Sequence, residues 1–106
     1  MKIIWSDFSS GILFDIFTYY KENTSMTVAR KIKSNIFKST KQLIKHPDPG
    51  QIEENLEHLG QVHRYLVEGN YKIVYRQVKE GILITDIFDT RQDPVKINNP
   101  KRKSGR

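Results

Sequence analysis

The sequence of 106 residues contains no cysteine, which excludes disulfide bonds, thiolate catalysis and cysteine-ligated metal sites. A reducing compartment is compatible with that absence. No run in the chain approaches the roughly 20 apolar residues of a membrane-spanning helix. The apolar run near its start is also too short for a signal peptide. We therefore expect a soluble, cytoplasmic protein whose length suits a single folded domain.

The sequence also lacks the short motifs that carry much of enzyme chemistry. It has no glycine-rich phosphate loop, no metal-ligand spacing and no nucleophile motif. Its three histidines, His46, His58 and His63, have no histidine or carboxylate partner at a spacing typical of metal ligands. We therefore expect neither a cofactor nor a bound metal.

Acidic residues are the minority charge, with 12 against 18 basic residues and a net charge of +6. Four of the basic residues, Lys101, Arg102, Lys103 and Arg106, lie in the last six positions without an acidic residue among them. Removing these four leaves 14 basic against 12 acidic residues. We therefore predict a domain of residues 1–97 and a basic, flexible tail of residues 98–106. Such a tail suits an acidic partner or nucleic acid, or is a solvated chain end.

Residues 63–92 have the pattern of three antiparallel strands joined by two tight turns. Val, Ile, Tyr and Phe recur there, and Gly-Asn at 69–70 and Glu-Gly at 80–81 lie where the chain must reverse. A two-residue turn at 69–70 places Leu66 opposite Ile73, and residues directly opposite share one face of a sheet.

Two such turns assign the strand side chains to two faces, because the side-chain period of a strand is two. The first face, which we expect to form the core, carries Leu66, Tyr71, Ile73, Tyr75, Ile84 and Phe88. The second face, which we expect to be half polar, carries His63, Tyr65, Val67, Lys72, Val74, Arg76, Thr85, Ile87, Asp89 and Arg91. A three-residue second turn would exchange the two faces of the last strand.

The chain before the sheet has the pattern of two helices that cover one of its faces. A Ser6 or Asp7 cap begins a helix that runs to about residue 22, and a second helix spans about 26–45. The motif HPDPG at 46–50 ends the second helix. The short apolar run KIIW at 2–5 predicts an edge strand. The expected fold is α+β: an N-terminal edge strand and an antiparallel helical hairpin packed on a 3–4-stranded antiparallel sheet.

The second face gathers groups that could cleave RNA through its own 2′-hydroxyl. That reaction needs a base, cations that stabilise the phosphate charge, and an acid for the leaving oxygen. An unperturbed histidine changes charge near neutral pH, so His63 could act as acid or base. Lys72, Arg76 and Arg91 could hold the phosphate. The alternative is an ordinary solvated face on which Lys72 pairs with Asp89.

Four stretches together resemble the RelE/ParE superfamily, the toxins of type II toxin–antitoxin modules. They are IIWS near the start, HPDPG after the second helix, the strand pair HRYLVEGNYKIVY and the last strand ILITDIFDTRQDP. The resemblance covers roughly residues 2–97 and is most specific from Arg64 to Gln92. It implies the same arrangement of a helical hairpin on a sheet.

The resemblance implies two activities, which differ in their residues. RelE-like members cut messenger RNA at the ribosome with basic residues of the sheet, whereas ParE-like members lack that set and poison DNA gyrase. The two RelE lysine positions fall at His63 and Tyr65 here, and the first arginine position falls at Lys72. The later arginine matches Arg91, but the C-terminal tyrosine has no counterpart because no tyrosine follows Tyr75.

This incomplete set favours a ParE-like toxin that inhibits DNA gyrase and is neutralised by a cognate antitoxin. The alternative is a ribosome-dependent mRNA endoribonuclease with His63, Lys72, Arg76 and Arg91 as catalytic residues. A third hypothesis is a degenerate binding module without toxicity. Whether the chain is an enzyme stays open at this point.

The resemblance also implies that the C-terminal segment of the antitoxin wraps the toxin as an extended strand or a helix, over its helical hairpin and sheet edge, in a hetero-oligomer. Three aromatic residues could receive such a segment if they are exposed, namely Phe14, Tyr19 and Phe37. The alternative is that these three side chains are buried within the chain itself.

Overall fold

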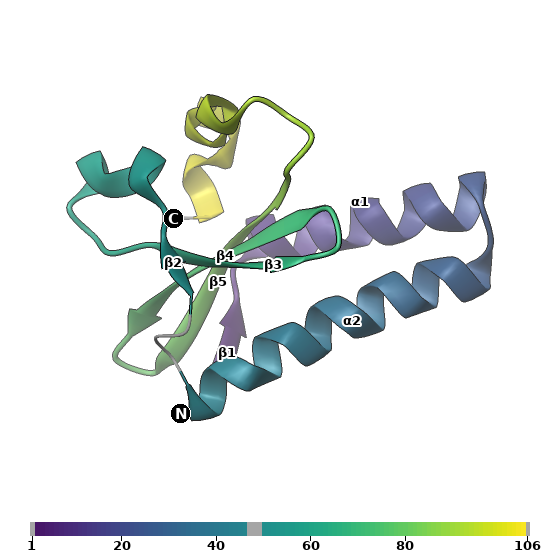
Figure 1. Cartoon of the computed structure of the whole chain (residues 1–106), viewed down its shortest axis with the longest axis horizontal. Coiled ribbons are helices and arrows are strands. Elements are labelled where there is room, and N and C mark those ends of the chain that lie inside the picture. The colour runs from purple at the N-terminus through teal and green to yellow at the C-terminus, as the bar shows by residue number, and fades with distance from the viewer. Residues whose placement is uncertain (1, 47–49, 106) are drawn as a thin grey trace.

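The computed structural model describes residues 2–46 and 50–105, the last three of them by their backbone alone. Strand β1 (Lys2–Trp5) leads into an antiparallel hairpin of two long helices, α1 (Asp7–Asn23) and α2 (Met26–Lys45) (Figure 1). The remaining elements are β2 (Gln51–Ile52), the 3-10 helix η1 (Glu54–Leu59), β3 (Arg64–Glu68), β4 (Tyr71–Val78), β5 (Gly81–Asp89) and the 3-10 helices η2 (Pro94–Asn98) and η3 (Pro100–Gly105). The predicted α+β class is confirmed.

Each long helix begins at a serine cap. The Ser6 hydroxyl accepts a hydrogen bond from the Ser9 amide at 3.1 Å, and the Ser25 hydroxyl accepts one from the Val28 amide at 3.1 Å. Caps of this kind typically stabilise a helix by about 1 kcal/mol. The buried Ser9 hydroxyl also donates to the Ile84 carbonyl of β5 at 2.9 Å, which fixes the start of α1 against the sheet.

The predicted helix bounds agree with the structure to within one residue. The helix α2 ends at Lys45, and the amide of His46 donates to the Gln42 carbonyl at 3.1 Å. Pro47 and Pro49, which we expected to end this helix, lie outside the described residues.

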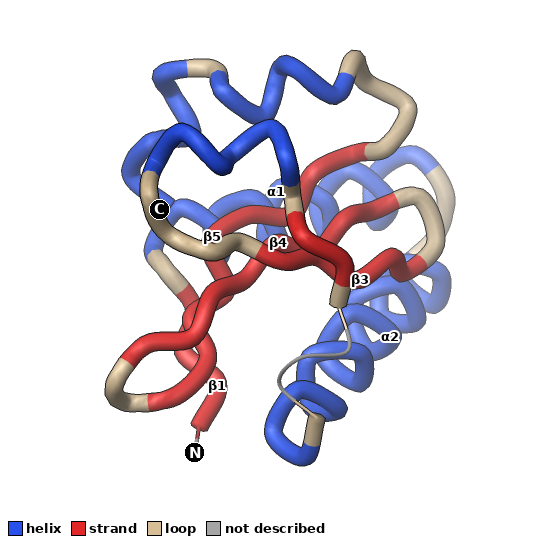
Figure 2. Tube along the Cα trace, turned by 60° about the vertical axis from the view of Figure 1, so that its left-hand side comes forward, coloured by secondary structure: helices blue, strands red, loops and turns tan. Residues whose placement is uncertain are grey.

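The five strands form one sheet in the order β1-β5-β4-β3-β2, with β1 parallel to β5 and the other neighbours antiparallel (Figure 2). The predicted edge strand at the N-terminus is confirmed. The short strand β2 and the parallel pairing of β1 go beyond the expected 3–4 antiparallel strands. Gly81 permits the close approach of β1, because a Cβ there would lie 2.1 Å from the Lys2 carbonyl oxygen.

The helical hairpin covers one face of this sheet and forms the larger core with it. The predicted register of β3 and β4 is confirmed, with Leu66 opposite Ile73 and Arg64 opposite Tyr75. The buried residues of this core are Leu13 from α1, Ile36 and Leu43 from α2, and Tyr71, Ile73, Tyr75, Ile82, Ile84 and Ile87 from the sheet.

The predicted faces of β5 are wrong beyond Ile84, because the strand contains a β-bulge. The turn before β5 is formed by Lys79 and Glu80 and not, as predicted, by Glu80 and Gly81, since Val78 pairs with Gly81. Ile84 still lies on the predicted face and pairs with Tyr75, but the next pair on β4 is Val74 with Asp86, which leaves Thr85 as an extra residue. One extra residue exchanges the faces of everything that follows it.

After the bulge, three residues of β5 therefore change sides. Ile87 pairs with Ile73 and lies in the larger core, whereas Phe88 pairs with Lys72 on the opposite face. Asp89 pairs with Tyr71, so it too leaves the face to which we assigned it.

The second face is covered rather than solvated, which corrects the expectation of an open, half-polar surface. A smaller core forms there from Leu56 of η1, Ile97 of η2, and Val74 and Phe88 of the sheet, with Tyr65 packed against it. The 3-10 segments that supply this cover lie across the sheet from the long helices (Figure 2). The sheet is therefore the middle layer of three.

The last described residues pack against the start of α1 and against β5. Arg102 forms an ion pair with the buried carboxylate of Asp86, and its guanidinium lies 5.0 Å from the ring centroid of Phe88 and 5.7 Å from that of Phe8. The division into a domain of 1–97 and a flexible tail of 98–106 stays a prediction, but its residue Arg102 is docked. Within the described residues, no helix is long and apolar enough to cross a membrane.

Candidate functional site

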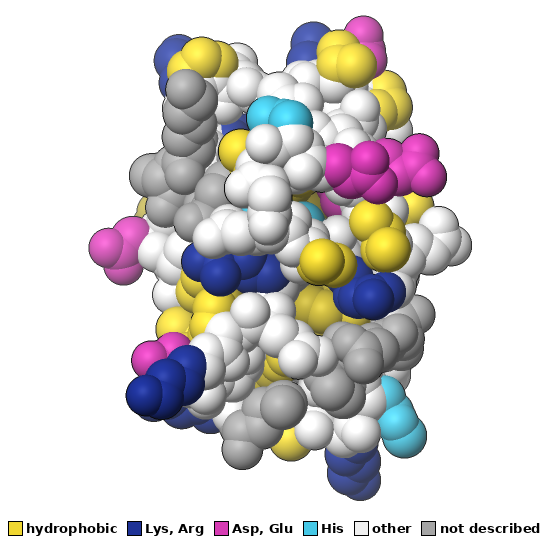
Figure 3. All heavy atoms as spheres, turned by 90° about the vertical axis from the view of Figure 1, so that its left-hand side faces the viewer, with side chains coloured by type: hydrophobic (Ala, Val, Ile, Leu, Met, Phe, Trp, Pro, Cys, Tyr) yellow, Lys and Arg dark blue, Asp and Glu magenta, His cyan; other side chains and the backbone are white. Residues whose placement is uncertain are grey.

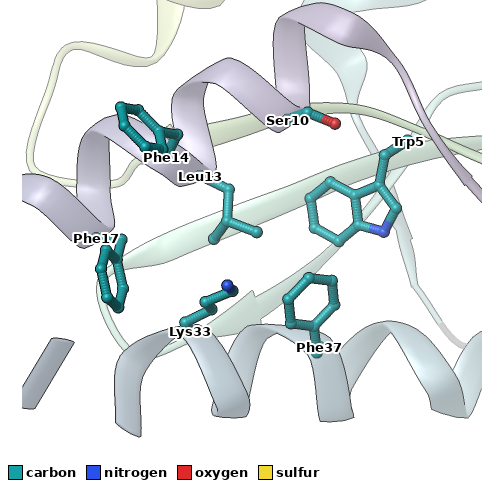
Figure 4. Close-up of a pocket in the computed structure, with 7 residues that line it drawn as sticks. All are labelled: Trp5, Ser10, Leu13, Phe14, Phe17, Lys33 and Phe37. Carbon is teal, nitrogen blue, oxygen red and sulfur yellow. The ribbon is translucent and has the colours of Figure 1, made fainter. Parts of the chain in front are cut away.

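An apolar groove runs between the two long helices, beside β1. It has a volume of about 480 Å³ and is lined by Trp5 of β1, by Ser10, Leu13, Phe14 and Phe17 of α1, and by Lys33 and Phe37 of α2. We call it the helical groove (Figure 4). The α1 residues recur at intervals of three and four, so they share one side of that helix.

The aromatic side chains of the helical groove are held in place but not covered. The Phe14 side chain is 68% exposed, and Phe37 is half-buried against Trp5, with their ring centroids 5.4 Å apart in an edge-on arrangement. A free protein rarely leaves such rings together at its surface unless a partner covers them. The prediction that Phe14 and Phe37 receive a partner is therefore compatible with their placement.

Tyr19, the third aromatic candidate, lies in a different hollow. Its side chain is 58% exposed and lines a cavity of about 410 Å³ between α1 and the end of β5, together with Asp89 and Arg91. Its ring packs edge-on against that of Tyr20, at 5.2 Å between centroids. The three aromatic candidates therefore belong to two sites rather than one.

The candidate catalytic residues are not gathered in one open site. His63 is buried, at 1% exposure, and its Nδ1 lies 3.2 Å from the Gln61 carbonyl oxygen. The Lys72 ammonium donates to the Glu53 carboxylate at 2.8 Å and lies 4.3 Å from the ring centroid of Tyr65. Lys72 therefore pairs with Glu53, and not with Asp89 as the alternative interpretation had it.

The pair of Lys72 and Glu53 is largely removed from water. The side chains are 19% and 2% exposed, respectively. Burial alone would raise the pKa of Glu53, but hydrogen bonds from Lys72 and Asn55 and the charge of Lys72 outweigh it, so the pKa lies below its usual value. The carboxylate is thus ionised at neutral pH and fixes the ammonium group.

Arg76 and Arg91 lie apart from that pair and from each other. Arg76 lines a polar hollow of about 410 Å³ with Gln61, Arg64 and Gln77 at the start of β3. Arg91 lines the Tyr19 hollow beside α1, on the side of the sheet opposite Lys72.

Arg91 is also bound by its neighbour in the chain. Its Nε and Nη2 atoms donate to both carboxylate oxygens of Asp89, at 3.0 and 2.7 Å. This hydrogen bonding lowers the pKa of Asp89 and raises that of Arg91. The hydroxyl of Tyr71 lies nearby, 3.4 Å from that of Tyr20, and its burial raises the pKa of Tyr71.

The charges on the end of the molecule that carries η1 and the β4–β5 turn are dispersed. Basic, acidic and apolar side chains alternate across it, and the described residues form no broad cationic surface there (Figure 3). Within the described residues, no group of three or more histidine and carboxylate side chains could hold a metal ion. Among the described residues on this side, the ion pair of Lys72 and Glu53 can brace the fold.

Sequence reasoning did not identify Glu53, Trp5 or Lys33 as members of these sites. Glu53 reaches Lys72 only because η1 folds back over the sheet, and its segment carried no clear helical or strand pattern. Trp5 was assigned only to an edge strand. Lys33 could have been found from its spacing, since it lies four residues before Phe37 and so on the same side of α2.

Comparison with known proteins agrees with this architecture. Residues 3–94 match the model of a family described as ParE toxin of type II toxin-antitoxin system, parDE. Among solved structures, a chain of the chromosomal ParDE TA system from P. aeruginosa is similar in fold, with a TM-score of 0.68 and 18% identity over 84% of this chain and 95% of that chain. No curated protein sequence gives a significant match. The matched segment spans nearly the whole chain, which therefore belongs to the ParE toxin family of type II toxin–antitoxin systems.

Proposed function

We propose that this toxin stops growth by inhibiting DNA gyrase, and that it does not cleave messenger RNA. The observation that carries this proposal is the separation of the candidate catalytic residues. His63 is buried, Lys72 is paired with Glu53, and Arg91 lies on the other side of the sheet, paired with Asp89. Cleavage by a 2′-hydroxyl needs its acid, base and cations around a single phosphate.

The same proposal includes the place where the antitoxin binds. A toxin of this family has an antitoxin as its partner, and the helical groove offers that partner an apolar, partly exposed surface. We assign Phe14 and Phe37 to the contact with the antitoxin. Tyr19 lies in the separate hollow and would contact only a segment that continues around α1.

The proposed target also predicts the compartment in which the toxin acts. Gyrase acts on chromosomal DNA in the bacterial cytoplasm, so the toxin would work there. The antitoxin would meet it in the same compartment.

The direct test is a supercoiling assay with purified toxin and purified bacterial gyrase. Gyrase inhibition predicts loss of supercoiling, and trapping of cut DNA predicts linear plasmid after detergent and protease treatment. Primer extension on translated messages from induced cells should show no new ends. Full supercoiling at micromolar toxin, together with new cuts in translated messages, would replace this proposal with the endoribonuclease.

A further inference from the structure

The helical groove has one charged group near its centre. The Lys33 side chain reaches from α2 into the space between the helices (Figure 4). Its ammonium nitrogen lies 5.5 Å from the ring centroid of Phe17 and 5.9 Å from that of Phe37. Two aromatic rings thus fix the position of a cation at a site that is otherwise mostly apolar.

In the described part of the chain, this cation has no anion of its own. Within residues 2–46 and 50–105, which the structure describes, no carboxylate forms an ion pair with Lys33. The free toxin leaves the ammonium group in water, where its charge is hydrated. A partner that covers the groove would remove that water, and the charge would then need a carboxylate from the partner.

The helix α2, which forms one wall of the groove and contributes Lys33 to its lining, carries charges of one sign only. The helix carries six basic residues and no acidic residue in its 20 positions: Arg30, Lys31, Lys33, Lys38, Lys41 and Lys45. Its field therefore attracts an acidic segment and repels a basic one before contact is made.

We propose that Lys33 selects the antitoxin by pairing with one carboxylate that lies on the apolar side of the bound antitoxin segment. The inference rests on the proposed docking in the helical groove and adds the chemistry of the occupant. That occupant is an acidic, amphipathic helix with apolar side chains against Phe14 and Phe37 and one Asp or Glu facing Lys33.

A helix suits this groove better than an extended strand. Six of the seven lining side chains come from helices, whose backbone groups are already bonded within α1 and α2. A strand laid between them would leave its own amides and carbonyls against aromatic rings without partners, whereas a helix satisfies those groups internally.

The test uses the antitoxin identified by its ability to restore growth when co-produced with this toxin. Binding of the purified antitoxin to the purified toxin is measured by calorimetry. Lys33→Met keeps the packing of the side chain and removes its charge, and it should weaken binding by at least about tenfold because the partner's carboxylate loses its cation. Lys33→Glu should weaken binding further through repulsion.

The control on the same helix is Lys31→Glu, an identical change of charge at an exposed position outside the groove. It should weaken binding by less than about threefold, as expected for a charge outside the contact. One Asp→Lys or Glu→Lys substitution in the antitoxin should then restore binding to Lys33→Glu toxin, which identifies the paired residue.

Two results overturn the inference. Lys33→Met toxin that binds like the wild type shows that no carboxylate faces this lysine, and equal losses for Lys33→Glu and Lys31→Glu show a general effect of charge. The Phe14→Ala variant distinguishes these two results from an antitoxin that does not bind in the helical groove at all. If Phe14→Ala weakens binding while Lys33→Met does not, the antitoxin occupies the groove but Lys33 does not select it. If neither variant weakens binding, the antitoxin binds elsewhere.

Discussion

The two faces of the sheet are closed in different ways. Under α1 and α2, buried apolar side chains from both helices and from strands β4 and β5 form one continuous core. On the opposite face, four buried apolar residues form the core among the described side chains, and two ion pairs there supplement it. Glu53, which precedes η1, pairs with Lys72 of β4, and Arg102 of η3 pairs with Asp86 of β5.

The difference indicates a structural role for charged side chains on a sheet. Both pairs join a short helical segment to a strand, and the carboxylate side chains are only 2% and 1% exposed. A 3-10 segment buries little apolar surface, so a specific pair fixes its position where packing alone is weak. Basic residues on this face are therefore better explained by the attachment of the cover than by catalysis.

The largest effect should come from a cavity in the larger core. Ile73→Ala removes a fully buried side chain beneath the helices and should lower the free energy of unfolding by about 2–5 kcal/mol. Chemical denaturation measures the loss. Val67→Ala is the matched control on the neighbouring strand, with a side chain 62% exposed, and should stay within about 0.5 kcal/mol of the wild type. Equal losses at the two positions would contradict the assignment of the faces.

A smaller effect should come from breaking the ion pair between Lys72 and Glu53. Lys72→Met leaves the Glu53 carboxylate buried without its cation and should cost about 2 kcal/mol, less than for a fully buried pair because Lys72 is 19% exposed. Adding Glu53→Gln should recover most of that loss, since the buried negative charge is then gone. A double variant no more stable than Lys72→Met would show that the pair does not act as a unit in denaturation experiments.

The smallest effect should be a dependence on pH. The folded-state pKa of Glu53 is lowered, so its stabilising contribution is complete above the unfolded value of about 4.3 and is lost as the pH falls through the folded value. The Glu53→Gln variant lacks this contribution and should lose less stability than the wild type when acidified. Denaturation midpoints at neutral and acidic pH measure the difference. Parallel losses in the two proteins would place the acid sensitivity at other carboxylates, such as Asp89.

Sequence patterns were sufficient for the part of the fold that depends on local signals. A cap at Ser6 or Asp7 located the start of the first helix, which the structure places at Ser6, and a two-residue turn at 69–70 set the register of β3 and β4. The bulge at Thr85 left no such signal, because a threonine in a bulge cannot be told from a threonine at a regular strand position by its sequence pattern. That one residue placed Phe88 and Ile87 on faces opposite to those predicted.

The site was harder to predict because its contacts join distant segments. Exposed aromatic residues on the helices could be proposed from sequence, but only packing shows that Phe14 and Phe37 share a groove with Trp5 while Tyr19 does not. Likewise, Lys72 and Glu53 are 19 positions apart, and the intervening segment must fold back over the sheet before they can meet.

Growth arrest by the Lys72→Met/Glu53→Gln variant tests most directly the claim that the charges of the second face brace the fold. The variant removes both charges together and leaves the helical groove and the Tyr19 hollow untouched. Induced in cells and confirmed as folded, it should arrest growth to the same extent as the wild-type toxin, with translated messages uncut. A folded variant that no longer arrests growth would contradict this account and would assign the toxic activity to the second face.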